Sequence, residues 1–248
     1  MTAKAFLLKD KVALVAGDSQ LWTKPVATAL AGAGADIAIV AKGSPLLTEA
    51  VEAVRKTGRK ALALPVDVTK AAQVQKAVQQ IIAEYGHLDI LVNAGDIHFF
   101  RPFLKIKNAE WGKAMDYNFK SALNFCRAAG KPMLKQKNGR IINIVSGLAE
   151  RGIANGSAYC VAMGGVLQLT RALALEWALK GITVNAVGTG WFSETGQPVD
   201  ETLARYIPGK RFGRPEEIGS LVVYLASEVT EFTTGQFMFV DGGLMAHA

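Results

Sequence analysis

The stretch "SAYCVAMGG", residues 157–165, contains a tyrosine that could exchange a proton with a substrate. A free phenol has a pKa near ~10, and a nearby cation lowers it by about 1 to 3 units, toward the pH at which acid/base catalysis works best. One turn of helix places the residue four positions after Tyr159 beside it, and that residue is Met163. A thioether supplies neither a charge nor a strong donor. We therefore predict that Tyr159 lacks an activating group at this position.

A second stretch, "VAGDSQLWTKPVATAL", has the position of a phosphate-binding turn between a strand and a helix. Such a turn needs glycines, because they allow tight backbone geometry and close approach to a phosphate. Gly17 is the only glycine in the stretch. Leu21 and Trp22 add bulk, and Asp18 adds a negative charge. These residues predict a lost or distorted phosphate site.

Metal and disulfide chemistry is not expected from the thiol and imidazole residues. Cys126 and Cys160 are the only cysteines and show no C-x-x-C spacing, so we predict reduced thiols and no zinc site. His87, His98 and His247 lack the i, i+4 pairing of a helical metal site.

Composition places the chain among ordinary globular proteins. With 248 residues and 50% hydrophobic content, we predict one domain over residues 1–248. The net charge of +7 is spread along the chain, with its densest cluster at 131–140, and no nucleic-acid motif appears. We find no apolar run near the ~18 residues of a membrane helix and no signal peptide. The expectation is a cytoplasmic protein without nucleic-acid or membrane partners.

The elements that must position these residues alternate along the chain. Strand-like runs such as "KVALVAG", "DIAIVAKG", "LDILVNAG" and "GRIINIVSG" alternate with helical periodicity over 45–57, 70–85, 108–130, 157–180 and 215–227. This alternation predicts an α/β fold, a doubly wound parallel sheet with helices on both faces. Ligands bind such a sheet at the carboxyl ends of its strands, and the first strand-to-helix turn commonly holds a dinucleotide.

From "LKDKVALVAG" to "TGQFMFVDGG" the chain resembles a short-chain dehydrogenase/reductase of the single-domain Rossmann type, most specifically in "GRPEEIGSLVVYLASEVTEFTTGQ". The resemblance covers nearly the whole chain and implies that fold. In this family the first turn reads T-G-x-x-x-G-x-G. The matching residues are Ala16, Gly17, Leu21 and Thr23, with Trp22 in place of a small aliphatic residue, so two of three glycines are missing.

The resemblance gives a mixed picture of the other cofactor positions. Asp67 and Val68 match the pair that usually meets adenine. Asn93 matches part of the asparagine motif after the fourth strand, but the motif is out of step by one residue and Asp96 occupies a glycine position. Lys42 follows a position where NAD-specific members carry an acid, so any bound dinucleotide is expected to be NADP.

The catalytic residues of the family can be carried over one by one. Asn118 matches the helix asparagine, Ser146 the serine that orients the substrate carbonyl, and Tyr159 the acid/base. Met163 takes the place of the lysine that lowers the tyrosine pKa, holds the nicotinamide ribose and links the proton relay to solvent. On this reading the three matching residues are vestigial.

Losses at both ends of one cofactor predict a non-catalytic subunit that binds no cofactor. The resemblance implies that it assembles with an active paralogue of the family in a hetero-oligomer, expected to be a tetramer, through helices 108–130 and 157–180 and the C-terminal strand region. The pattern is similar to degenerate subunits of hydroxyacyl-CoA dehydrogenases in anaerobic toluene degradation.

Two alternatives stay open. One is an active oxidoreductase using NADP, or NAD, with a noncanonical site. The other is a non-redox enzyme similar to the halohydrin dehalogenases, which keep the serine and tyrosine. Those enzymes carry an arginine where this chain has Met163.

Overall fold

The protein is described here by a computed structural model of residues 6–43, 45–194 and 200–246. Seven strands of this part of the chain form one parallel sheet in the order β3-β2-β1-β4-β5-β6-β7. Their bounds are β1 Val12–Ala16, β2 Asp36–Ala41, β3 Ala61–Pro65, β4 Ile90–Asn93, β5 Gly139–Ser146, β6 Ile182–Thr189 and β7 Phe237–Val240. The predicted fold class is confirmed.

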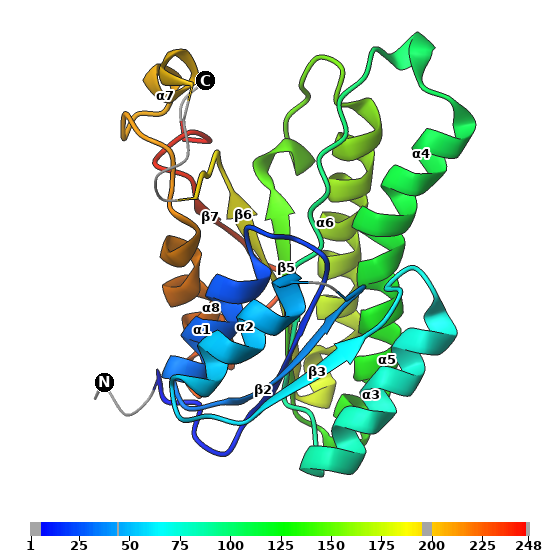
Figure 1. Ribbon diagram of the computed structural model, residues 1–248, viewed down its shortest axis with the longest axis vertical. Helices are drawn as coiled ribbons and strands as arrows, with labels where there is room; N and C mark the ends of the chain where they lie inside the picture. Colours follow the sequence, from blue (N-terminus) through cyan, green and yellow to red (C-terminus); the bar gives the residue numbers. More distant parts are fainter. Residues whose placement is uncertain (1–5, 44, 195–199, 247–248) are drawn as a thin grey trace.

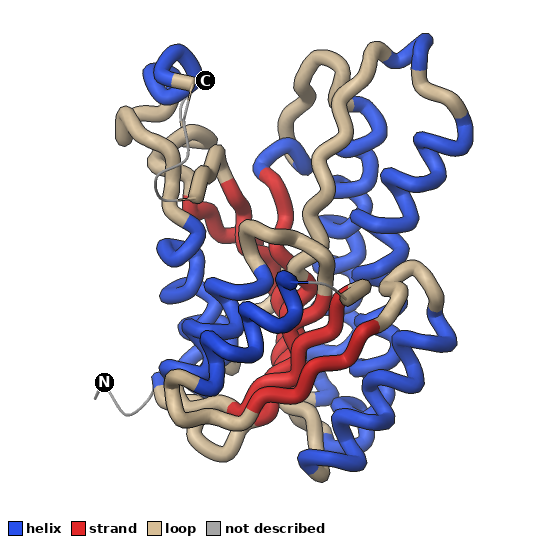
Figure 2. Tube along the Cα trace, viewed as in Figure 1, coloured by secondary structure: helices blue, strands red, loops and turns tan. Residues whose placement is uncertain are grey.

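Helices cover both faces of the sheet (Figures 1 and 2). On one face lie α1 (Thr23–Gly32), α2 (Pro45–Arg55) and α8 (Gly219–Ala226). On the other lie α3 (Ala71–Tyr85), α5 (Ser121–Gln136) and α6 (Ser157–Trp177), with α4 (Asn108–Met115) leading into α5. A short helix, α7 (Glu201–Tyr206), stands above the carboxyl end of the sheet near β6 and β7.

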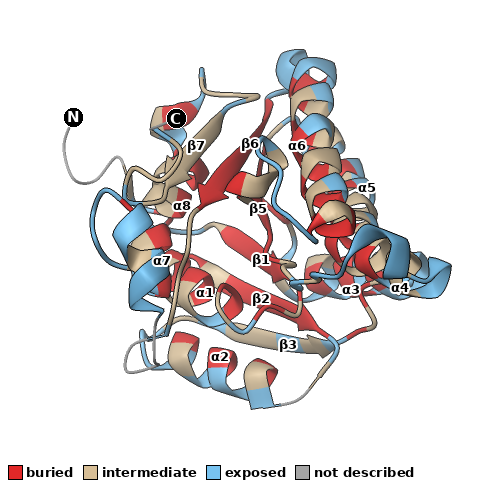
Figure 3. Cartoon of the chain, turned by 90° about the horizontal axis from the view of Figure 1, so that it is seen from above, coloured by how far each residue is buried: buried red, intermediate tan, exposed pale blue. Residues whose placement is uncertain are grey.

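The central strands are rich in aliphatic residues because both of their faces are covered, although β4 and β6 also bury polar residues such as Asn93 and Asn185. All residues of β1, β4 and β6 are buried, as Figure 3 shows for the middle of the sheet. Such strands are expected to be near-continuous runs of aliphatic residues rather than alternating ones. The two layers of helices therefore enclose one large core on each side of the sheet, and a smaller apolar cluster lies between α6 and the sheet.

The structure differs from the predicted helix 108–130 in one respect. The helix is interrupted by a π-helical turn, Asp116–Lys120, and the second helix continues to Gln136. The predicted helix 157–180 is α6 followed by a 3₁₀ turn, Ala178–Lys180. A π turn keeps the overall helical direction, so periodicity alone does not reveal it.

One expectation about apolar segments was wrong. By length and composition alone, the segment Ser157–Lys180 is long and apolar enough to cross a membrane. In the fold, the α-helix of this segment contacts β5, β6 and α5. Of the most apolar stretch of the segment, 44% is buried inside the protein. Burial against the sheet accounts for this hydrophobicity, as in the core helix of a globular protein.

The order of the strands fixes where a ligand can bind. The chain builds outward from β1 to β3, then returns to the middle of the sheet and continues from β4 to β7. At the reversal between β1 and β4, Ala16 pairs with Asn93, and their loops diverge toward opposite faces. In doubly wound sheets ligands bind at such a point, outside the carboxyl ends of the strands, and the residues discussed below lie at these ends.

Candidate active site

The predicted catalytic residues come together at the carboxyl end of the sheet. Ser146 is the last residue of β5 and pairs with Thr189, the last residue of β6. Tyr159 is the third residue of α6, the helix that follows β5 in the chain. The Ser146 hydroxyl interacts with the Tyr159 phenol and acts to lower its pKa. The structure thus brings the serine and the tyrosine together.

Met163 lies beside Tyr159 on the buried side of α6, as the i, i+4 spacing predicted. Both side chains are 1% exposed and belong to a small apolar cluster that also contains Val145 and Val166. The thioether contributes packing to this cluster and no charge to the phenol.

The phenol instead faces a carboxylate. The Tyr159 hydroxyl donates a hydrogen bond of 2.5 Å to Asp96 Oδ1, and the Trp22 indole N–H donates one of 2.9 Å to Asp96 Oδ2. His98 Nε2 lies 3.5 Å from Asp96 Oδ1. The Asp96 side chain is 6% exposed, whereas that of His98 is 57% exposed. A buried carboxylate therefore joins the tyrosine to a histidine at the surface.

These contacts shift three pKa values. Burial and the nearby Asp96 charge raise the pKa of Tyr159 well above its usual value. Burial also acts to raise the pKa of Asp96, but the interactions with His98, Tyr159 and Trp22 outweigh it and hold that pKa below its usual value. The hydrogen bond to Asp96 raises the pKa of His98 despite partial burial. At neutral pH the carboxylate is ionised and the phenol is protonated.

Asn118 supports this cluster through the backbone. Its side-chain Oδ1 accepts a hydrogen bond of 2.8 Å from the Ile97 N–H, and its Nδ2 donates one of 2.9 Å to the Ile97 carbonyl. Asn118 lies in the π-helical turn and is 2% exposed. The asparagine therefore fixes the residue between Asp96 and His98.

The first strand-to-helix turn differs from the expectation that bulk projects toward a phosphate. Trp22 is 2% exposed and packs edge-to-face on Phe192, with ring centroids 4.9 Å apart. Leu21 is partly buried against the core beneath α1. Asp18 accepts a 2.6 Å hydrogen bond from the Lys42 N–H, so its carboxylate is held by the end of β2. Trp22 therefore occupies the interior, whereas Leu21 packs against the core on one side and lines a surface pocket on the other.

Gly17 and Thr23 shape the same turn. Gly17 has φ +139°, and a Cβ there would lie 2.5 Å from the Gly95 N, so the turn requires glycine for its contact with the β4 loop. The Thr23 hydroxyl donates a hydrogen bond of 3.1 Å to the Gly17 carbonyl. The missing glycines have thus been replaced by residues that the loop packs inward or ties to its own backbone.

The adenosine side of the predicted cofactor site keeps suitable groups. Lys42, directly after β2, reaches to 3.3 Å from the Tyr117 hydroxyl, and this hydrogen bond raises the lysine pKa. Asp67, after β3, accepts hydrogen bonds from the Thr69 N–H and hydroxyl, which fix its carboxylate. An exposed ammonium group at the end of β2 fits a ribose phosphate, so this half of the site fits an NADP molecule.

Two predicted cofactor residues lie within the protein. The Asn93 side-chain amide donates a hydrogen bond of 2.7 Å to Asn143, which in turn donates to Thr170. Val68 is 1% exposed and belongs to the core beneath α3. The structure gives both side chains internal contacts, and through its backbone carbonyl Val68 also accepts a hydrogen bond from Asn124.

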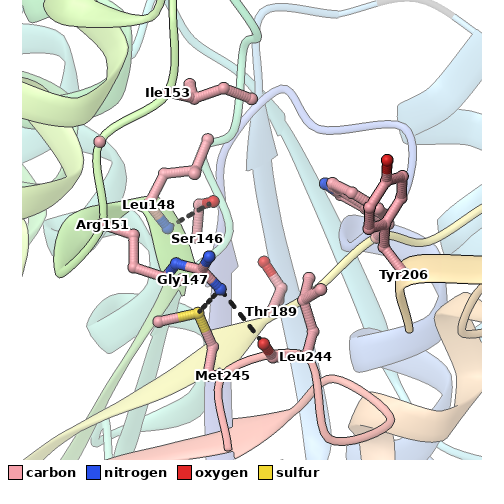
Figure 4. Close-up of a pocket in the computed structure, with 12 residues that line it drawn as sticks. Ser146, Gly147, Leu148, Arg151, Ile153, Thr189, Tyr206, Leu244 and Met245 are labelled. Carbon is pink, nitrogen blue, oxygen red and sulfur yellow. Dashed lines mark hydrogen bonds between the residues drawn. The ribbon is translucent and has the colours of Figure 1, made fainter. Parts of the chain in front are cut away.

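A cavity of about 200 Å³ adjoins Ser146 (Figure 4). Arg151 enters it from the loop after β5, and its Nη1 donates a hydrogen bond of 3.2 Å to the Leu244 carbonyl. Met245 Sδ lies 3.9 Å from the same nitrogen. The lining combines apolar, hydroxyl and cationic groups: Ser146, Gly147, Leu148, Arg151, Gly152, Ile153, Thr189, Gly190, Trp191, Tyr206, Leu244 and Met245.

Sequence reasoning placed the serine and the tyrosine in the site but missed the contacts of Asp96 and His98 with Tyr159 and the position of Arg151 in the cavity. Asp96 had a signal, because it stands where the family pattern has glycine. In the described ranges, no group of three His, Cys, Asp or Glu side chains could hold a metal. His247 lies outside the described residues, and both cysteines are free thiols.

Comparisons with known proteins cover almost the whole chain. The family profile described as enoyl-(acyl carrier protein) reductase matches residues 23–245. The chain is 34% identical over 255 residues to the 2-dehydro-3-deoxy-D-gluconate 5-dehydrogenase of Escherichia coli K12, covering 99% of this chain and 100% of that protein.

Solved structures lead to the same group of proteins as the sequence comparisons. A short-chain type dehydrogenase/reductase from Mycobacterium marinum has a TM-score of 0.91 and 33% identity, with 100% of both chains covered. A gluconate 5-dehydrogenase from Burkholderia cenocepacia, in complex with NADP and tartrate, has a TM-score of 0.91 and 29% identity, with 99% of each chain covered.

These comparisons correct two predictions. The relatives are dehydrogenases and reductases, so the prediction of a non-catalytic subunit is wrong. The similar structure that contains NADP contradicts the prediction of a chain without a cofactor. The physical reason is visible in the first turn, where Trp22 is buried and Leu21 is partly buried against the core. A toluene-pathway subunit finds no support, and the hetero-oligomeric tetramer stays a prediction.

Proposed function

Because this chain belongs to the short-chain dehydrogenase/reductase family, we propose that it is an active NADP-dependent oxidoreductase that interconverts a secondary alcohol and a ketone on a small hydroxy acid. The observation that carries the proposal is the Ser146–Tyr159 pair beside a cavity that Arg151 enters. A substrate oxygen that hydrogen-bonds Ser146 is brought next to the tyrosine. The pair can then orient that oxygen and exchange its proton.

The residues that would hold the cofactor lie at the ends of the first three strands. Lys42 would pair with the 2′-phosphate, and Asp67 would meet the adenine. The turn after Gly17 and the N-terminus of α1 would face the pyrophosphate, where the helix dipole favours negative charge. When bound, the nicotinamide ring supplies the hydride acceptor or donor.

Arg151 supports the choice of an acidic substrate. A guanidinium group recognises a carboxylate through two parallel hydrogen bonds, and the cavity has otherwise mostly apolar and hydroxyl lining. Thr189 adds a hydroxyl-bearing side chain to the lining. Similar proteins are named for gluconate and 2-dehydro-3-deoxygluconate, and one contains tartrate, all of them hydroxy acids or keto acids.

The experiment is a turnover and binding assay on the purified chain. Calorimetry measures binding of NADPH and NADH, and absorbance at the nicotinamide band follows oxidation of gluconate and related hydroxy acids. We expect saturable NADPH binding and turnover of at least one hydroxy acid. The Ser146→Ala and Tyr159→Phe variants should bind NADPH but lose turnover by about 10²-fold or more. A wild-type protein that neither binds the dinucleotide nor turns over any hydroxy acid would refute the proposal.

A further inference from the structure

The carboxylate at Asp96 has no counterpart in the family pattern, and its contacts join the acid/base residue to the surface. We propose that Asp96 and His98 form a proton path between Tyr159 and solvent, taking over the relay that the missing lysine would provide. This inference rests on the proposed oxidoreductase function.

The two oxygens of the Asp96 carboxylate have different partners. Oδ2 accepts the indole N–H of Trp22 at 2.9 Å, which fixes the orientation of the group. Oδ1 accepts the Tyr159 hydroxyl at 2.5 Å and lies 3.5 Å from His98 Nε2. Oδ1 is therefore the single atom shared by the tyrosine and the histidine.

The outer end of the path reaches water through His98. The imidazole packs edge-to-face on the Tyr159 ring, with centroids 5.3 Å apart, and is more than half exposed. The two hydrogen bonds from Asn118 to the Ile97 backbone hold the loop between the carboxylate and the imidazole. A loop fixed in this way keeps the three groups aligned for transfer.

The chemistry of alcohol oxidation balances along this path. The substrate O–H bond breaks and its proton passes to the Tyr159 oxygen, while the proton of Tyr159 passes to Asp96 Oδ1. The electron pair of the broken O–H bond becomes the second bond of the carbonyl, and the C–H pair leaves as hydride to the oxidised dinucleotide. His98 then takes the proton from Asp96 and releases it to water. Reduction runs in the opposite direction.

Three elements supply the groups around the path. Tyr159 on α6 faces Asp96 and His98 from the β4 loop and Ser146 from β5, with Cys160 next to it in its own helix. The raised pKa of Tyr159 keeps the phenol protonated, so it can pass a proton on while receiving one. The lowered pKa of Asp96 keeps the carboxylate unprotonated between turnovers, and it favours passing a received proton on to His98 over retaining it. A neutral His98 is then needed for release to solvent.

Three variants test the path by kinetics. Asp96→Asn should lower kcat for alcohol oxidation by about 10²-fold or more, with KM changed much less. Asp36→Asn is the matched control, because this carboxylate holds Arg59 at the opposite end of the sheet, and its kcat should equal that of the wild type. In the wild type, kcat for oxidation should rise with pH through the His98 pKa, above its usual ~6.5. His98→Ala should remove this step, and added imidazole should restore turnover.

A titration without cofactor gives an independent readout. Tyrosinate absorbance of the free protein, compared with Tyr159→Phe, reports the ionisation of Tyr159. Asp96→Asn should lower the pKa of Tyr159 by about 1–3 units, because a like charge is removed from its hydroxyl.

The possible failures can be distinguished. An active wild type whose Asp96→Asn variant keeps its kcat, pH profile and Tyr159 titration would overturn the proton path alone. A wild type inactive toward every hydroxy acid would overturn the proposed function and the proton path with it.

Discussion

Replacing Trp22 with phenylalanine tests how firmly the Asp96 carboxylate is held. The variant removes the indole N–H that donates to Asp96 Oδ2 and keeps an aromatic ring that can pack on Phe192. A hydrogen bond to a charged acceptor contributes about 1.5–3 kcal/mol, and water cannot replace the donor at a side chain that is 6% exposed. Including the smaller ring, we expect Trp22→Phe to lower the free energy of unfolding by about 2–4 kcal/mol at neutral pH.

A double-mutant cycle separates the hydrogen bond from the packing. Unfolding in urea is measured for the wild type, Trp22→Phe, Asp96→Ala and the double variant. The coupling energy should be about 1.5–3 kcal/mol at neutral pH, because the change in ring size cancels in the cycle.

The pH dependence of this coupling follows from the lowered pKa of Asp96. Stability from an ionised carboxylate is fully present above its unfolded-state pKa of about 4, and it is lost as pH falls through the folded-state pKa. The coupling should therefore be constant down to about pH 5 and decline below about pH 4. A coupling near zero at neutral pH, or one that is unchanged in acid, would refute the reasoning.

Three further predictions concern separate parts of the site. Gly17→Ala should lower the free energy of unfolding by about 1–3 kcal/mol, because the φ of +139° at this position is strained for alanine. The added Cβ would also lie 2.5 Å from the Gly95 N, which adds to the loss. Wild-type stability of this variant in urea would contradict the prediction. Lys42→Glu should raise KM for NADPH by about tenfold or more and leave KM for NADH nearly unchanged; an equal effect on both would show that the lysine does not meet the 2′-phosphate. Arg151→Met should raise KM for hydroxy acids by about tenfold but not for their uncharged esters. Steady-state kinetics on matched acid and ester pairs measures this, and an equal change in KM for both would contradict it.

The scaffold could be predicted from the sequence because it depends on local patterns. Strands buried on both faces are runs of aliphatic residues, and helices show their own period, so the order of elements was evident. The i, i+4 spacing likewise placed Met163 beside Tyr159 correctly. The π-helical turn at Asp116–Lys120 was missed because it adds no break in composition.

The rest of the site depends on contacts between distant positions. Tyr159 and Asp96 are 63 residues apart, and Asp96 and Trp22 are 74 apart, so no local pattern joins them. The sequence showed bulk at Leu21 and Trp22 but not that the loop buries Trp22 and packs Leu21 partly against the core. Reading the missing lysine as lost activity was wrong for a related reason, since absence of one group says nothing of a group supplied by another loop.

The buried indole of Trp22 also places a fluorescent group in the site. Its N–H donates to Asp96, its ring packs on Phe192, and the chain has only four tryptophans. Protonation of that carboxylate changes the electric field across the indole ring, which shifts the emission of a tryptophan shielded from water. We therefore expect the emission of Trp22, isolated by subtracting that of the Trp22→Phe variant, to report the charge state of Asp96 with no probe attached.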